Sequence, residues 1–155
     1  MQIQQLNRTD AEKVFVVITN ADADTITTGM GVRYVGGAAA EVVSTNGANA
    51  VKVAADAAMP QFAGIANQDI ASNGAGLVQA FGYVNSILLS AEANKTVGVT
   101  GIANSFLKVG AVAGSFTSTQ TAQALSTFAG KFVQAWTTAN ISGGLNYAAG
   151  FVRAI

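Results

Sequence analysis

The residues best suited to bind a metal ion in this sequence are two aspartates, Asp22 and Asp24, which flank a single alanine. Carboxylate oxygens are the ligands that Ca²⁺ prefers, and this pair could contribute oxygens to such an ion. No further carboxylate lies close in sequence to complete a coordination shell. We therefore interpret the pair as an acidic turn, and we predict no metal and no other cofactor.

Three other carboxylates, Asp10, Glu12 and Glu41, are the candidates for acid–base chemistry, which requires two groups held close together. Their spacing does not indicate such proximity. The chain contains no histidine and no cysteine, which removes the commonest general base, the commonest metal ligand and any thiolate nucleophile. No spacing of Ser, Lys or carboxylate residues suggests a nucleophile with its base. We therefore expect that the protein is not an enzyme and has no catalytic residues.

The remaining motifs are weak. The run "GMGVRYVGG" has too wide a gap before its third glycine for a dinucleotide-binding loop, and it leads into a strand-like segment. Three glycosylation sequons begin at Asn7, Asn94 and Asn140, and without a secretory signal we interpret them as chance matches. Trp136 alternates with Gln134 in a strand-like run and is predicted to lie in a core or an interface.

The same sequence gives no sign of export, membrane insertion or nucleic-acid binding. No signal peptide is visible at the N-terminus, and no run of eighteen uncharged apolar residues predicts a transmembrane helix. The basic residues are scattered along the chain, which argues against a nucleic-acid-binding face.

The elements that must position all these residues are short apolar runs separated by glycine. The run "KVFVVITN" (13–20) is mostly β-branched and predicts a buried strand. "LVQAFGYVNSILLS" (77–90) predicts one long strand, or two strands bent at Gly82. Similar runs predict strands over 31–35 with Arg33 outward, 50–55 with Lys52 outward, 61–66, 105–116, 130–138 and 146–155, with a short strand at 25–27. One short helix is predicted over 117–127.

Eight to ten strands with glycine at intervals of 8–12 residues are typical of an all-β fold, either a small β-barrel or a β-sandwich. We expect an N-terminal arm at 1–12 and a single β-rich domain at 13–155. Within that domain, 36–58 is ambiguous and could be an insertion or subdomain. The dipeptides Asn73-Gly74 and Gly143-Gly144 predict tight turns.

Low charge predicts association with other chains. Charged residues make up 10% of the chain and the net charge is zero, whereas about 25% is usual for a globular domain. Zero net charge removes the repulsion that keeps monomers apart. We expect other subunits to cover much of the surface. A neutral monomer with a Ser/Thr/Asn/Gln surface remains the alternative.

Four segments resemble the capsid decoration, or cement, proteins of tailed bacteriophages. They are "EKVFVVITNADADTITTGMGVRYV", "MPQFAGIANQDIASNGAGLVQAFGYVNSILLS", "NSFLKVGAVAGSF" and the closing "FVRAI". The resemblance extends from about Lys13 to the end, and residues 36–58 match least. It implies a β-tulip-like fold, a homotrimer, and a place on the outer surface of the virion. There the protein would bridge major capsid proteins and stabilise the shell.

The resemblance implies no small-molecule substrate, and it directs attention to surfaces that could contact the capsid or a neighbouring subunit. The candidates are Ile3 and Leu6 of the arm, and the two turns at Asn73, Gly74, Gly143 and Gly144. Three alternatives stay open: a head or tail fibre component, a tail-tube-like protein, and a small β-barrel that binds a ligand or glycan.

Overall fold

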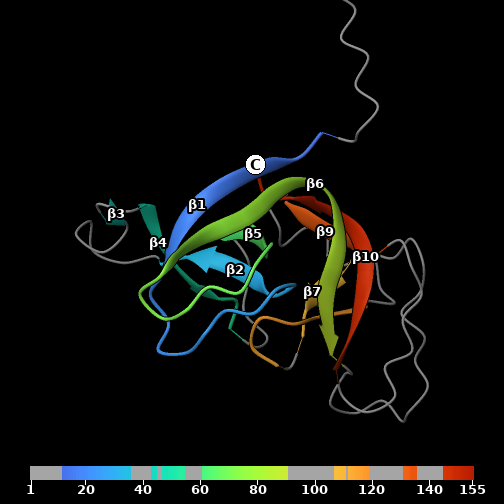
Figure 1. Cartoon of the computed structure of the whole chain (residues 1–155). Helices are drawn as coiled ribbons and strands as arrows, with labels where there is room; N and C mark the ends of the chain where they lie inside the picture. Colours follow the sequence, from blue (N-terminus) through green and yellow to red (C-terminus); the bar gives the residue numbers. More distant parts are fainter. Residues whose placement is uncertain are drawn as a thin grey trace, which may run out of the picture.

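The computed structural model describes residues 12–35, 43–44, 47–54, 61–90, 107–110, 112–118, 131–135 and 145–155. In this part of the chain all regular structure is β-strand, and the strands form one hydrogen-bonded network (Figure 1). The prediction of an all-β fold is confirmed. Across the described ranges, no helix has the length and apolar character needed to cross a membrane.

The ten strands are short, with the exception of β6 and β10. They are β1 (Val14–Asn20), β2 (Gly31–Tyr34), β3 (Val43–Ser44), β4 (Gly47–Lys52), β5 (Phe62–Ala66), β6 (Ala75–Ser90), β7 (Leu107–Val109), β8 (Phe116–Ser118), β9 (Phe132–Ala135) and β10 (Leu145–Arg153).

Five of these strands close into a barrel in the order β1–β4–β2–β5–β6, because β6 pairs back with β1. The β1–β6 pairing is antiparallel and places Val17 opposite Leu77. The β1–β4 pairing is parallel and begins only at Ile18, opposite Ala48. Closure leaves few open strand edges, which is how small β-proteins avoid unwanted pairing. The barrel interior is filled by Ile18, Ile26, Val32, Ala50, Ala63, Ala66, Ile70 and Val78.

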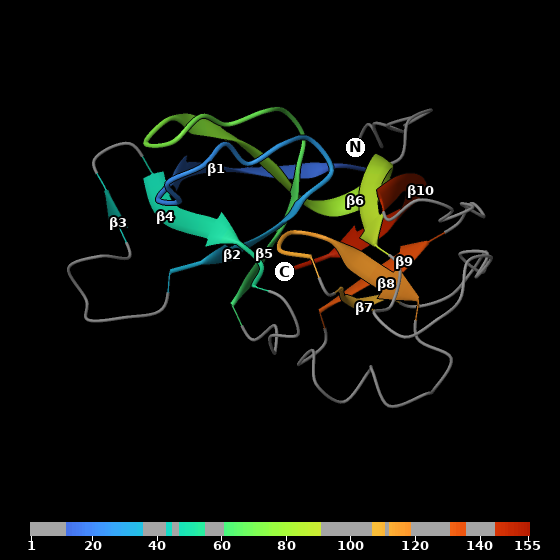
Figure 2. The ribbon, with the colours of Figure 1, turned by 90° about the horizontal axis from the view of Figure 1, so that it is seen from below.

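A second core lies beside the barrel, around the C-terminal half of β6. That half pairs on one edge with β10, which pairs with β9, and on the other edge with β8, which pairs with β7. Figure 2 shows the two groups of strands side by side, with β6 running between them. The second core contains Val53, Phe62, Ile65, Ala80, Val84, Ile87, Leu89, Leu107, Val109, Phe116, Val133, Ala135, Ala148, Val152 and Ala154.

Of the two alternatives predicted for 77–90, one long strand or two strands bent at Gly82, the structure has one long strand, β6, which curves along its length (Figure 1). Gly82 has a φ of +105°, a conformation that L side chains rarely adopt, and the strand continues on both sides of it. This curvature lets the first half of β6 form a wall of the barrel while the second half forms a wall of the second core. The turn predicted at Asn73-Gly74 is also present, with Asn73 at a φ of +60°.

The first strand is present as predicted, but it is not fully buried. Phe15 and Val17 are 39% and 53% exposed. A barrel wall has only one inward face, so alternate residues of β1 must point out. The continuous apolar run concealed this alternation.

Other sequence predictions need smaller corrections. Arg33 and Lys52, expected to point outward, are both half-buried. The strand expected at 25–27 is a single bridge between Ile26 and Ile70. The first two residues of the helix expected at 117–127 belong to β8, and the rest of that segment lies outside the described residues, as do most of the arm and most of 36–58.

Candidate functional site

A buried asparagine at the end of β1 holds one end of the barrel together. Asn20 is completely buried, and its side-chain amide donates hydrogen bonds to the carbonyl oxygens of Asp24 and Ile70, each at 2.9 Å. Its side-chain oxygen accepts a hydrogen bond from the backbone N–H of Asp22 at 2.8 Å. A single side chain therefore satisfies three backbone groups from two loops, which fixes the loops against each other.

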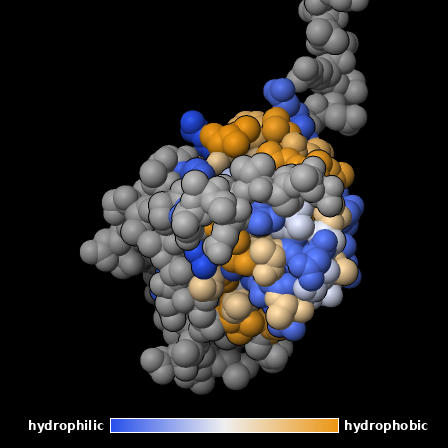
Figure 3. All heavy atoms as spheres, turned by 90° about the vertical axis from the view of Figure 1, so that its left-hand side faces the viewer, coloured by the Kyte–Doolittle hydropathy of each residue, from blue (hydrophilic) through white to orange (hydrophobic). Residues whose placement is uncertain are grey.

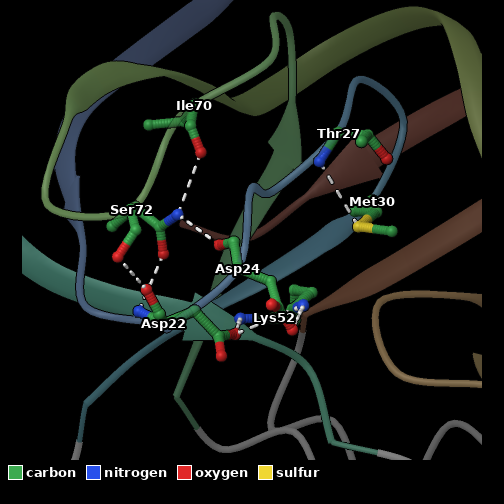
Figure 4. Close-up of polar contacts among 8 residues, drawn as sticks. Asp22, Asp24, Thr27, Met30, Lys52, Ile70 and Ser72 are labelled. Carbon is green, nitrogen blue, oxygen red and sulfur yellow. Dashed lines mark hydrogen bonds and ion pairs between the residues drawn. The ribbon is translucent and has the colours of Figure 1, made fainter.

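Asp22 and Asp24, the candidate Ca²⁺ ligands, lie beside a lysine (Figure 4). The Lys52 ammonium is 3.4 Å from a carboxylate oxygen of Asp24 and 4.0 Å from one of Asp22. The Lys52 backbone N–H also donates to Asp22, at 3.1 Å. A positive charge thus already lies within 4.0 Å of both carboxylates, and no cluster of three potential metal ligands occurs in the described ranges. This geometry agrees with an acidic turn closed by an ion pair.

The ion pair is a weak stabiliser. The Asp24 side chain is 81% exposed, and exposed pairs of this kind contribute about 0.2–1 kcal/mol. The Asp22 side chain is 27% exposed and that of Lys52 15%, so the lysine stem packs along the barrel while its ammonium reaches the acidic turn. The group links β4 to the loop after β1.

The one charged residue between Phe62 and Leu89, Asp69, closes a second loop contact. One of its carboxylate oxygens accepts hydrogen bonds from the backbone N–H of Thr28, at 2.7 Å, and from the Thr28 hydroxyl, at 2.9 Å. These bonds favour the ionised form, first the backbone one and then the side-chain one, and they lower the pKa of Asp69 below its usual value. The Asp69 carboxylate is exposed, and its role is to join its own loop to the loop that contains Thr28.

The predicted contact residues Asn73 and Gly74 lie in the turn that precedes β6. The turn is closed by a bond from the Gly74 N–H to the Ala71 carbonyl at 2.9 Å. Backbone bonds also join it to Asn20, from the Asn73 N–H at 2.8 Å and to the Gly74 carbonyl at 2.9 Å. Asn73 is exposed and Gly74 half-buried, so the Asn73 side chain is available to a partner. Ile3, Leu6, Gly143 and Gly144, the other predicted contacts, lie outside the described residues.

Several chemistry-bearing candidates also fall outside the described part. These are Asp10, Glu41, Trp136 and the sequon residues Asn7, Asn94 and Asn140. Glu12 is described and lies exposed just before β1. The described ranges bring none of the proposed acid–base partners together.

The most distinctive surface is apolar, and the sequence did not single it out. We call it the β1–β6 face and define it by Phe15, Val17 and Leu77, which are 39%, 53% and 39% exposed. Val17 and Leu77 are directly opposite each other across the two strands. Figure 3 shows apolar side chains gathered at the top of the molecule, where β1 and β6 lie in Figure 1. Exposed apolar clusters of this kind mark interaction sites.

A row of aromatic rings crosses β6, β10 and β9. Phe81 and Phe151 meet edge to face with ring centroids 5.1 Å apart, and Phe151 stacks on Phe132 at 6.0 Å. All three residues are half-buried. Because the rings pack against one another, they stabilise the sheet and offer only part of their surface to a partner.

Comparison of the chain with models of protein families gives no match, and comparison with curated proteins gives no significant match.

Proposed function

We propose that this protein is a structural component of a tailed-phage head, a decoration or cement protein that binds the outside of the shell and bridges major capsid proteins. Two lines of reasoning support the proposal. The sequence segments described above resemble that family. The fold provides a closed barrel braced by a second core, and it leaves the apolar β1–β6 face exposed.

The β1–β6 face is the observation that carries the proposal. Its three side chains lie on a closed sheet, so little conformational freedom is lost when a partner covers them. An uncharged face also avoids the desolvation that charged side chains would require. In a shell the same weak contact is repeated many times, so each copy needs only a modest affinity. Homotrimer formation belongs to the proposal through the resemblance alone.

Binding to undecorated shells tests the proposal directly. Purified protein is mixed with phage heads that lack a decoration protein, the particles are pelleted, and occupancy is measured against protein concentration. We expect saturable binding, and negative-stain images should show added knobs on the shell. Absence of binding to shells of its own phage would refute the proposal.

A pair of variants on β6 tests the role of the face. Leu77→Ser removes an apolar side chain from the β1–β6 face, and Asn85→Ser changes an exposed residue on the other half of the same strand. We expect Leu77→Ser to lower occupancy several-fold at limiting concentration, and Asn85→Ser to bind as the wild type does. Equal binding by both variants would place the shell contact elsewhere, with the turn at Asn73 as the next surface to test.

A further inference from the structure

Among the residues that the structure describes, the N-terminal half of β1 has a strand partner on one edge only. On the β6 side it is paired from Val14 to Thr19. On the other side its pairing with β4 begins at Ile18, and the described residues contain no other strand that pairs with β1. Within the described part of the chain, residues 14–17 therefore present backbone groups on an edge that no strand covers, next to the exposed side chains of Phe15 and Val17. Such an edge is a ready template for another strand.

We propose that this edge receives residues 6–11 of a second copy of the chain, added antiparallel to residues 12–17. The eleven residues that precede Glu12 are joined to the chain at the start of this edge. An extended chain spans about 3.3 Å per residue, so six residues suffice to cover the edge. Each copy gives one arm and receives one, which closes a symmetric assembly.

The side chains select the register. Lys13, Phe15 and Val17 share the exposed face of β1, and in an antiparallel pair directly opposite residues share a face. When Leu6 lies opposite Val17, Arg8 lies opposite Phe15 and Asp10 opposite Lys13. These three pairs are apolar with apolar, cation with aromatic ring, and anion with cation.

The neighbouring registers that keep the same side chains on the exposed face give less favourable pairs of opposite side chains. A shift of two residues in one direction places Asp10 opposite Phe15, and a shift in the other direction places Arg8 opposite Lys13. The first sets a carboxylate against an aromatic ring, and the second sets two cations against each other. This register cannot form within one chain. It places residue 11 directly opposite residue 12, and two consecutive residues of one strand cannot lie opposite each other. The partner must therefore be another copy.

Engineered disulfides test the register, and the chain suits this experiment because it has no cysteine. The double variant Leu6→Cys/Val17→Cys places two thiols directly opposite each other, at a separation that a disulfide spans. The control Gln5→Cys/Val17→Cys moves one thiol to the opposite face. We expect mild oxidation to link chains of the first variant into covalent oligomers that reductant dissolves, and to leave the control unlinked.

A charge exchange provides a second readout on proteins that fold normally. Asp10→Lys and Lys13→Asp should each weaken self-association about ten-fold in sedimentation equilibrium, because each puts like charges opposite each other at every arm contact. The double variant Asp10→Lys/Lys13→Asp should restore it. Both measurements use free protein, so a chain that exchanges arms but does not bind shells keeps this inference and loses the proposed function.

Four outcomes would overturn the inference. They are a monomeric wild type at tens of micromolar, a disulfide within one chain, equal cross-linking of the two cysteine variants, and no rescue of self-association by the double charge variant.

Discussion

Gly82 is the position where one side-chain carbon should do most damage. Its φ of +105° lies in a region that costs a residue with a Cβ about 1–3 kcal/mol. A Cβ built there would also run into the Glu12 carbonyl oxygen and lie 3.2 Å from the Lys13 Cα. Both neighbours are backbone atoms just before β1, so they cannot rotate away, and overpacking of this kind costs about another 1–3 kcal/mol. Gly82→Ala should therefore destabilise the fold by about 2–6 kcal/mol.

Two matched variants separate the two causes. Gly150 has no positive φ, but a Cβ there would collide with the Gln134 carbonyl oxygen, so Gly150→Ala tests collision alone. Gly74 has no positive φ either, and its Cβ would meet its nearest atom, the Ala71 carbonyl oxygen, at 3.0 Å. Gly74→Ala should cost less than about 1 kcal/mol.

The assay is thermal unfolding followed by circular dichroism. At about 2–4 °C per kcal/mol for a chain of this size, Gly82→Ala should lower the Tm by roughly 4–24 °C. Gly150→Ala should fall between Gly82→Ala and Gly74→Ala. If Gly82→Ala melts together with Gly74→Ala, then β6 does not need a positive φ at Gly82 and the account of two cores joined by one curved strand is wrong.

Three further predictions concern the polar contacts. Asn20→Ala leaves three backbone groups without their partner and should cost about 2–4 kcal/mol, whereas Asn85→Ala on the surface should be nearly neutral in urea unfolding; equal effects would contradict the role of Asn20. Because the pKa of Asp69 is lowered on folding, its stabilising contribution is present above the ordinary pKa of about 4 and is lost as the pH falls through the folded pKa. Asp69→Asn should thus lower the Tm at pH 6 but not at pH 2. If the Tm difference between the variant and the wild type is the same at both pH values, the ionised Asp69 does not stabilise the contact with Thr28. Millimolar Ca²⁺ should leave the wild-type Tm unchanged because the Lys52 ammonium lies beside both Asp22 and Asp24 and would repel a cation there. A rise of several degrees would show that the two aspartates bind the metal.

Much of the local structure could be predicted from the sequence, because it depends on neighbouring residues. Short apolar runs bounded by glycine or polar residues located β1, β5, β6 and β10. The need for positive φ located the turn at Asn73 and marked Gly82 within β6. Strand order could not be obtained in this way. The barrel closes because β6 pairs with β1, and that pairing joins residues about sixty positions apart in the chain.

The candidate site shows the same division. Asp22 and Asp24 were recognisable as an acidic turn, but their partner Lys52 comes from a strand 30 residues after Asp22. Asn20 was visible only as the end of a strand, because nothing in a sequence marks which polar side chain will be buried. Phe15 and Val17 were mistaken for core residues since both faces of β1 are apolar, and only closure of the barrel decides which face points outward.

The scarcity of charge between Phe62 and Leu89 now has a structural cause. All five residues of β5 are buried, with Ala63 and Ala66 in the barrel and Phe62 and Ile65 in the second core. The strand β6 crosses from one core to the other, so it too is apolar along most of its length. The polar residues of this stretch gather in the loop before β6, where Asp69 lies. Two cores that share two strands therefore explain most of the composition, without a partner. They do not explain Leu77, Phe15 and Val17, which no described core needs. Association of the chain is therefore favoured by these three side chains and by the edge of β1 beside them, and the low average charge of the chain adds nothing to them.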